Sequence, residues 1–201
     1  MFTFSRRFLV AALFTALLLA GCGGQVTEPS SAGSGSEPST TAPATATAQP
    51  SHTAKLVRWR KPVEEIFVHP LVLRPKLAFT KDSLGQGFAD YFVTDGEFER
   101  MLDQLWANGW TLVDARKVAA REVWVPKGRK PLVLIEDDVN YYEYFDGRGL
   151  ARRLVLDSDG AVRAELPDGS LSDRDVVPMV EEAIAEHPEF SAEGARGVLA
   201  L

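Results

Sequence analysis

Residues 131–138 read PLVLIEDD, and this stretch carries the two features on which the fold prediction depends. Pro131 introduces an uninterrupted apolar run, which predicts a strand buried on both faces, as in parallel sheets. Glu136 and two adjacent aspartates, Asp137 and Asp138, follow the run directly. Because the backbone turns where a strand ends, both aspartates are able to reach one cavity.

The segments before this strand predict a strand, a helix and a second strand. Residues 66–72 are β-branched and aromatic, ending near Pro70, and residues 110–113 form another short apolar run. A helix is predicted between them, since Thr94 and Glu97 have the spacing of a capping box and a glycine follows the helix. The apolar positions of this helix fall at helical spacing: Phe98, Met101, Leu102, Leu105 and Trp106.

The segments after the strand predict a hairpin, a helix and one more strand. Residues 153–156 and 161–166 flank a turn of Asp, Ser and Gly residues. Asp175 is a candidate N-cap for a helix that ends at His187. Residues 198–201 are an apolar run that reads as a strand cut off where it begins. Alternating strands and helices predict an α/β fold with a mostly parallel sheet.

Composition divides the chain of 201 residues, with net charge −6, into three unlike segments. Residues 55–201 hold 20 basic and 26 acidic side chains, so almost all of the charge lies there. A segment of this length is able to bury one real core, with roughly two-thirds of the unfolded surface removed from water. Its acidity argues against a nucleic-acid partner, which requires a concentrated basic face.

Residues 1–21 have the pattern of a secretory signal peptide, with Arg6 and Arg7 before an apolar run. The run ends in small residues before Cys22 and resembles the lipobox of bacterial lipoproteins, in which the cysteine becomes a lipidated N-terminus. This predicts an extracytoplasmic protein held to the membrane by a lipid anchor. The alternative is an ordinary signal peptide in which Cys22 has no role.

Residues 22–54 contain Ser, Thr, Ala, Pro and Gly and no aromatic side chain, which predicts a disordered tether with reach of roughly 30 Å. Cys22 is the only cysteine of the chain, so no disulfide stabilises the domain at residues 55–201.

The adjacent carboxylates suit a site in which a cation joins them, one as a metal ligand and the other as a base. In parallel α/β sheets, catalytic residues collect at the carboxyl ends of the strands. The alternative is a solvated acidic loop. His69, at the end of the first strand, is a second candidate for the site, and its alternative is a hydrogen-bonded structural histidine.

The order of these segments resembles the amino-terminal half of the polysaccharide deacetylases, a carbohydrate esterase family with a distorted β/α barrel. The resemblance covers roughly residues 64–201. It rests on FVHP at residues 67–70, FVTDGEF at residues 92–98, LWANGWTLV at residues 105–113 and PLVLIEDD at residues 131–138. The stretch DVNYY at residues 138–142 is similar to a lipoprotein subgroup. The implied fold is the amino-terminal part of such a barrel, truncated.

The resemblance implies removal of acetyl groups from an acetylated polysaccharide by a metal-activated water. Carried over by position, Asp137 is the catalytic base and Asp138 binds a divalent metal, usually zinc, with His69 near the site. Tyr141 and Tyr142, together with Tyr144 and Phe145, are candidates to floor a sugar subsite. The alternative for this aromatic cluster is packing in the core or at an interface.

Two departures from the family pattern limit this expectation. Glu136 and Val139 stand where the family has Phe and Gly around its aspartate pair. The H-x-x-x-H motif that completes the family's metal site is missing, since the only histidines are His52, His69 and His187. We therefore expect a membrane-tethered deacetylase if a further segment completes it. The alternatives are an inactive glycan-binding or scaffold lipoprotein, or a truncated gene product.

Overall fold

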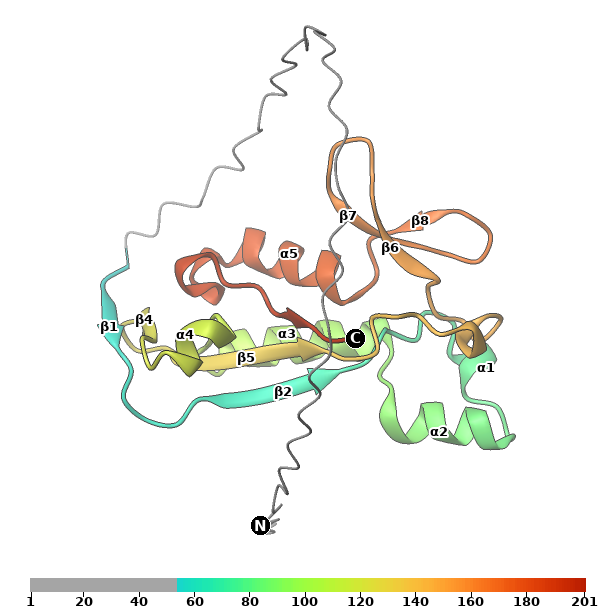
Figure 1. Cartoon of the computed structure of the whole chain (residues 1–201), viewed down its shortest axis with the longest axis horizontal. Helices are drawn as coiled ribbons and strands as arrows, with labels where there is room; N and C mark the ends of the chain where they lie inside the picture. The colour runs from blue at the N-terminus through green and yellow to red at the C-terminus, as the bar shows by residue number, and fades with distance from the viewer. Residues whose placement is uncertain (1–53) are drawn as a thin grey trace, which may run out of the picture. The chain divides into compact units, whose positions relative to one another are not determined.

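The computed structural model describes residues 54–201 (Figure 1). The predicted signal peptide, the lipidation site Cys22 and nearly all of the predicted tether lie outside these residues. The strands are β1 (Leu56–Arg58), β2 (Glu64–Val68), β3 (Trp110–Leu112), β4 (Trp124–Pro126), β5 (Lys130–Glu136), β6 (Arg153–Leu156), β7 (Val162–Glu165), β8 (Leu171–Ser172) and β9 (Val198–Leu199). The helices are α1 (Pro75–Ala78), α2 (Ser83–Tyr91), α3 (Asp95–Ala107), α4 (Ala115–Ala119) and α5 (Val176–Glu186), with short 3-10 turns at Glu143–Phe145, Pro188–Phe190 and Ala192–Gly194.

The central sheet is built around β5, and all of its pairings are parallel. Strand β2 lies along one side of β5, with Val68 opposite Glu136. Strand β3 pairs with the start of β5 on the other side, and β9 pairs with its end. The prediction of a mixed α/β fold with a mostly parallel sheet is therefore confirmed. The sheet is open within the described residues, because no strand joins its two edges.

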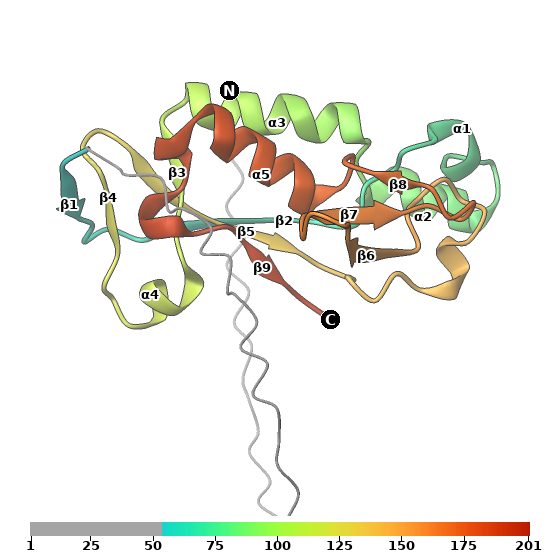
Figure 2. The same cartoon turned by 90° about the horizontal axis from the view of Figure 1, so that it is seen from above.

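Successive side chains of β5 point to opposite faces of the central sheet and therefore pack against different layers. Leu132 and Leu134 pack with α3 and α5, and Figure 2 shows these two helices on the same side of β2 and β5. Val133 and Ile135 point the other way and pack with the antiparallel β1–β4 ribbon and the region of α4. Glu136 follows the same alternation, so its side chain belongs to the α5 face.

The predicted features of α3 and α5 are present. Thr94 caps α3 by accepting from the Glu97 N–H at 3.2 Å, while the Glu97 carboxylate accepts from the Thr94 N–H at 2.8 Å. Gly109 follows the helix with φ of +78°, a conformation that glycine adopts without strain. Asp175 caps α5, since its Oδ1 accepts from the Val176 N–H at 2.8 Å. The predicted hairpin is also present as β6 and β7.

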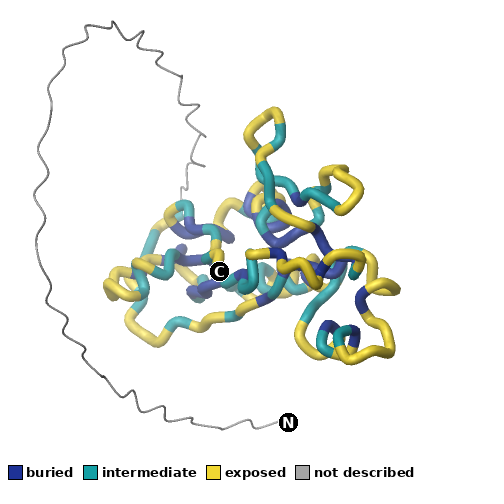
Figure 3. The backbone as a smooth tube through the Cα atoms, turned by 45° about the vertical axis from the view of Figure 1, so that its right-hand side comes forward, coloured by how far each residue is buried: buried dark blue, intermediate teal, exposed yellow. Residues whose placement is uncertain are grey.

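A third group of elements lies at the carboxyl end of the sheet and was not predicted in full. Helix α2 packs Phe88 against Phe145 and the β7 residue Ala164. Its sequence, SLGQGFADY, contains two glycines, which have poor helix propensity, so the apolar period alone does not identify it. Asp82 compensates by accepting from the Gly85 N–H at 2.7 Å. Figure 3 shows exposed residues at the loops of the β6–β8 hairpins and buried residues within the layers.

No helix within residues 54–201 combines the length and the apolar character needed to cross a bilayer.

Candidate functional site

The candidate site lies where β2 and β5 end side by side. His69 follows β2, and Asp137 and Asp138 follow β5, so the parallel register brings the three residues to one edge. The Asp137 N–H donates to the Val68 carbonyl at 2.8 Å, which continues the pairing by one residue. The Nε2 atom of His69 then lies 4.0 Å from Oδ2 of Asp138. The structure thus gathers the predicted histidine and both predicted carboxylates.

A left-handed backbone turns Asp138 toward His69. Asp138 has φ of +60°, which is uncommon outside glycine but is tolerated by aspartate. The Asp138 N–H donates to Oδ1 of Asp137 at 3.0 Å, so the Asp137 carboxylate stabilises the turn. Backbone strain of this kind collects at ligand-binding positions. The turn gives the adjacent aspartates different environments. The Asp137 carboxylate accepts from a backbone N–H, whereas the Asp138 carboxylate lies beside the imidazole of His69.

His69 is held in one orientation by its neighbours. Its Nδ1 lies 3.1 Å from the carbonyl oxygen of Tyr91, which accepts only, so Nδ1 carries the proton. Its ring stacks on Phe92 with centroids 4.7 Å apart, and Phe67 meets it edge-on at 5.9 Å. The ring therefore presents Nε2 to Oδ2 of Asp138. When Nε2 carries no proton, both atoms are acceptors, and a hydrogen-bond donor or a cation placed between them would satisfy both.

An exposed aromatic platform adjoins this pair. The rings of Tyr142 and Tyr144 stack at 5.3 Å with an interplanar angle of 10°, and both are exposed. Buried Phe145 lies edge-on beneath both rings and also contacts Phe92, the ring on which His69 stacks. Burial and the charge of Asp138 raise the pKa of Tyr144, so Tyr144 lies close enough to Asp138 to interact with its charge. We call Tyr142 and Tyr144 the tyrosine platform.

Tyr141, the partner of Tyr142 in the predicted sugar subsite, lies elsewhere. It is buried, with 8% of its surface exposed, and its hydroxyl donates to Oδ2 of Asp175 at 2.9 Å. Oε1 of Glu136 lies 3.4 Å from the same hydroxyl. Little of the ring is left open for stacking on a sugar, so of this pair the structure places only Tyr142 at the surface.

Glu136, Tyr141 and Asp175 form a buried polar cluster beneath the site. Asp175 accepts from Tyr141, from the Val176 N–H and, at 3.5 Å, from the Leu71 N–H. Glu136 is 1% exposed, and its Oε2 has no partner among the described residues. Burial and the nearby Asp175 charge raise the pKa of Glu136 to about 8. Asp175 therefore holds the negative charge, and Glu136 is a neutral acid at neutral pH.

The described residues do not make a catalytic metal site. No group of three or more His, Cys, Asp or Glu side chains in residues 54–201 is placed to hold a metal ion. His69 and Asp138 offer two donor side chains, whereas catalytic zinc takes about three protein ligands and one open position. The residues present therefore do not fit the divalent metal that the resemblance implies.

Comparison of the chain with models of known protein families, with characterised proteins and with solved structures finds no match.

Two features of the buried polar cluster do not follow from the sequence analysis: the burial of the Glu136 side chain, and the hydrogen bond between Tyr141 and Asp175. The resemblance marks Glu136 only as a replacement for Phe, although its place two residues after Leu134 on an alternating strand indicates the helix-facing side. Asp175 was predicted only as an N-cap. Its contact with Tyr141 joins residues 34 positions apart and has no local signal.

Proposed function

We propose that residues 54–201 bind an acetylated polysaccharide at the carboxyl ends of β2 and β5. The observation that carries the proposal is the tyrosine platform beside the His69–Asp138 pair. Exposed, parallel aromatic rings offer apolar faces on which the C–H faces of pyranose rings pack. The pair beside them offers the Asp138 carboxylate and the imidazole Nε2 to sugar hydroxyl or amide N–H groups. Apolar faces next to a few oriented polar groups are typical of sites for small polar ligands.

The framework under the platform supports binding with little rearrangement. Phe145 and Phe92 connect the platform to the His69 ring, and each of these contacts is between packed aromatic rings. The imidazole is fixed by Tyr91 and Phe92, so a sugar meets a preset acceptor at Nε2. A preorganised site loses less conformational entropy when it binds.

Deacetylation is a second candidate function, favoured by the convergence of His69, Asp137 and Asp138. The proposal assigns the described residues to the amino-terminal part of a polysaccharide-deacetylase barrel. In it, Asp137 is the base and Asp138 a ligand. Only Oδ1 of Asp137 accepts a hydrogen bond among the described residues, which leaves its other oxygen for a proton. The metal is not accommodated by the residues present, so hydrolysis would require ligands from outside them.

We also propose that lipidation of Cys22 holds the domain at the outer face of the membrane, where such glycans occur. The proposal is supported by the sequence of residues 1–54 alone. Intact-mass analysis of the mature protein would test it, with acylated Cys22 as the expected N-terminus.

Titration with an acetylated chitooligosaccharide tests the binding proposal. We expect Tyr142→Ala to weaken binding about tenfold, because one face of the platform is lost. Trp124→Ala is the matched control, since Trp124 is an exposed aromatic residue on β4, at the other end of the sheet in Figure 1. Equal affinity of the wild type and Tyr142→Ala, or an equal loss in Trp124→Ala, would contradict the proposal.

Acetate release distinguishes the second candidate. We expect no release by this chain without further metal ligands. Release that is lost in Asp137→Asn would establish deacetylation and contradict that expectation.

A further inference from the structure

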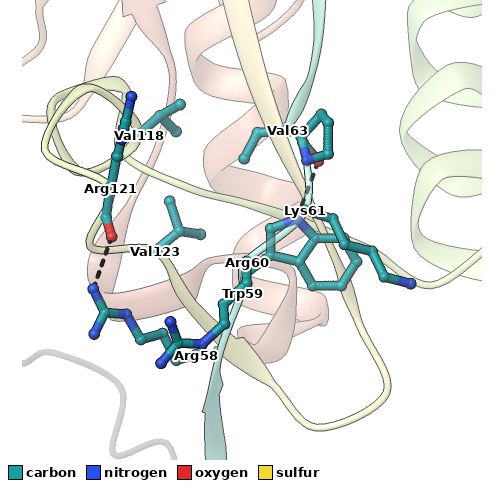
Figure 4. A pocket seen from close by; sticks show the side chains of 9 residues that line it. Arg58, Trp59, Arg60, Lys61, Val63, Val118, Arg121 and Val123 are labelled. Atoms are coloured by element: carbon teal, nitrogen blue, oxygen red, sulfur yellow. Dashed lines mark hydrogen bonds between the residues drawn. The ribbon is translucent and has the colours of Figure 1, made fainter.

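A basic pocket lies between β1 and the end of α4 (Figure 4). Figure 1 shows β1 at the opposite end of the domain from the segment after β5 that carries the tyrosine platform. The volume of the pocket is about 630 Å³, and the nine residues that line it include four cations and no carboxylate. The four cations are Arg58, Arg60, Lys61 and Arg121. Val63, Val118 and Val123 form an apolar floor together with Trp59. We call this feature the basic pocket.

The cations of the basic pocket lack the partners that other arginines have. Of the thirteen arginines in residues 54–201, nine form ion pairs with carboxylates of the described residues. Three of the remaining four line this one pocket. The domain is acidic as a whole, with 20 basic and 26 acidic side chains in residues 55–201. The side chains that line the pocket therefore carry net positive charge, opposite in sign to the net charge of the domain.

Arg121 occupies a position where the backbone favours glycine. It follows the C-cap of α4 with φ of +58°. The Arg121 N–H donates to Val118, and the Glu122 N–H donates to Lys117, the two hydrogen bonds of a Schellman motif. A side chain at this position is strained, while glycine is not. The Arg58 guanidinium donates to the Arg121 carbonyl at 3.2 Å, which fixes two cations on the same rim.

Two tryptophans flank the cations. Trp59 donates its indole N–H to the Pro62 carbonyl at 3.1 Å, and Lys61 lies 5.8 Å from its ring centroid. Trp124 is 40% exposed and pairs opposite Arg58 in the β1–β4 ribbon. Opposite residues of an antiparallel pair point to the same face, so Trp124 and Arg58 emerge together. Indole rings beside Lys and Arg side chains are typical of protein surfaces at a bilayer interface.

We propose that the basic pocket binds the phosphate groups of an anionic phospholipid surface. Its cations are carried on long exposed side chains around an open rim, which suits many phosphates in a plane. The chain also enters the domain at β1, directly after the predicted tether from Cys22. This end of the domain is therefore the nearest in sequence to the predicted lipid anchor, and it would leave the tyrosine platform facing away from the membrane.

Tryptophan quenching tests this proposal on the full chain. All four tryptophans lie in residues 59–124, so their emission reports on the domain and not on residues 1–53. The probes are vesicles of phosphatidylglycerol with phosphatidylcholine, or phosphatidylcholine alone, with brominated acyl chains. We expect stronger quenching on the anionic vesicles than on phosphatidylcholine alone, and loss of this difference at high salt because of screening.

Paired variants locate the surface. Arg60→Gln with Lys61→Gln should weaken the anionic contact about tenfold. Lys76→Gln with Lys81→Gln, the same charge change on exposed residues near α1, should leave it unchanged. Arg121→Gly should weaken the contact while the Tm stays the same or rises, a combination that a merely structural arginine would not give. Equal quenching on both kinds of vesicle, or an equal loss in the control pair, would overturn the proposal.

A test with soluble glycerol phosphate distinguishes a phospholipid surface from a soluble phosphate compound as the ligand of the basic pocket. We expect glycerol phosphate to leave the Trp59 indole resonance unmoved at concentrations where vesicles bind. A shift of that resonance by glycerol phosphate, without quenching by vesicles, would assign the pocket to a soluble phosphate compound and overturn the membrane proposal.

Discussion

Two pairs of carboxylates, Asp137 with Asp138 and Glu136 with Asp175, lie near the end of β5 in space and have opposite environments. Asp137 and Asp138 are partly exposed and face the candidate site, whereas Glu136 and Asp175 are 1% exposed and face the core. The alternation of β5 separates Glu136 from Asp137, and the left-handed turn separates Asp137 from Asp138. The backbone conformation at the end of β5 therefore buries Glu136 and leaves the next two acidic residues, Asp137 and Asp138, partly exposed. The buried pair governs stability, and the exposed pair is available for ligands.

The largest effect is expected from Asp175→Ala. This change removes the N-cap of α5 and the acceptor of the buried Tyr141 hydroxyl. We expect a loss of roughly 3 kcal/mol in the free energy of unfolding, because a buried donor loses its partner. Denaturation by urea measures it. Asp175→Asn keeps one of the two acceptor oxygens and is the control, so we expect a smaller loss than in Asp175→Ala; equal losses would show that charge and not hydrogen bonding is decisive.

The pH dependence of stability is expected to come from Glu136. Burial raises the pKa of Glu136 to about 8 in the folded chain, from the ordinary value of 4.5 that applies in the unfolded chain. Because the pKa is raised, its contribution to stability is present in full below pH 4.5 and is lost as the pH rises toward 8.

We expect the free energy of unfolding to fall across this window, since each unit of pKa shift corresponds to about 1.4 kcal/mol. Glu136→Gln should remove the part of the slope that lies above about pH 6, which urea unfolding at several pH values would show, whereas burial of Asp175 raises its own pKa to about 6 and contributes below that. Carboxylates with lowered pKa act in a different window. Asp157, whose pKa is lowered by hydrogen bonds from Ala161 and Asp159, changes stability only at acid pH. An unchanged slope in Glu136→Gln would contradict the assignment of the proton to Glu136.

A smaller effect is expected from Asp138→Gly. Glycine adopts φ of +60° without strain, so we expect stability to rise by about 0.5 kcal/mol. Binding of the chitooligosaccharide should weaken at the same time, because an acceptor is lost. Asp138→Ala should weaken binding and also lower the Tm. A gain in both stability and affinity in Asp138→Gly would show that Asp138 has no part in the site.

The smallest effect is expected from Asp137→Asn. Its amide oxygen still accepts from the Asp138 N–H, and the side chain is partly exposed. We expect a change in the free energy of unfolding below about 0.5 kcal/mol, measured beside Glu136→Gln. A loss as large as that of Asp175→Ala would remove the distinction between the exposed and the buried pair.

The sequence predicts the parts of the fold that depend on local pattern. The capping box of α3, the N-cap of α5, the hairpin and the parallel strands around residues 131–138 all follow from spacing and turn chemistry. Helix α2 is not predicted, because its two glycines obscure the helical spacing of its apolar residues. Strands β1 and β4 are three residues each, which is too short for a period to be seen.

The sequence predicts only those parts of the candidate site that depend on local pattern. The positions of His69, Asp137 and Asp138 follow from strand ends and parallel register. The burial of Tyr141 does not, because two adjacent tyrosines have no pattern that tells which one turns inward. Its φ of +48° and its bond to Asp175 decide the matter, and both depend on contacts distant in sequence.

The central claim is that the tyrosine platform and the His69–Asp138 pair form one glycan site. Mapping of side-chain NMR shifts during titration of the full chain with an acetylated chitooligosaccharide tests it most directly. We expect joint shifts of the Tyr142, Tyr144 and His69 ring resonances with one affinity, and none at Trp124. Shifts confined to the Trp124 end of the domain, or no shift at the His69 ring, would contradict it.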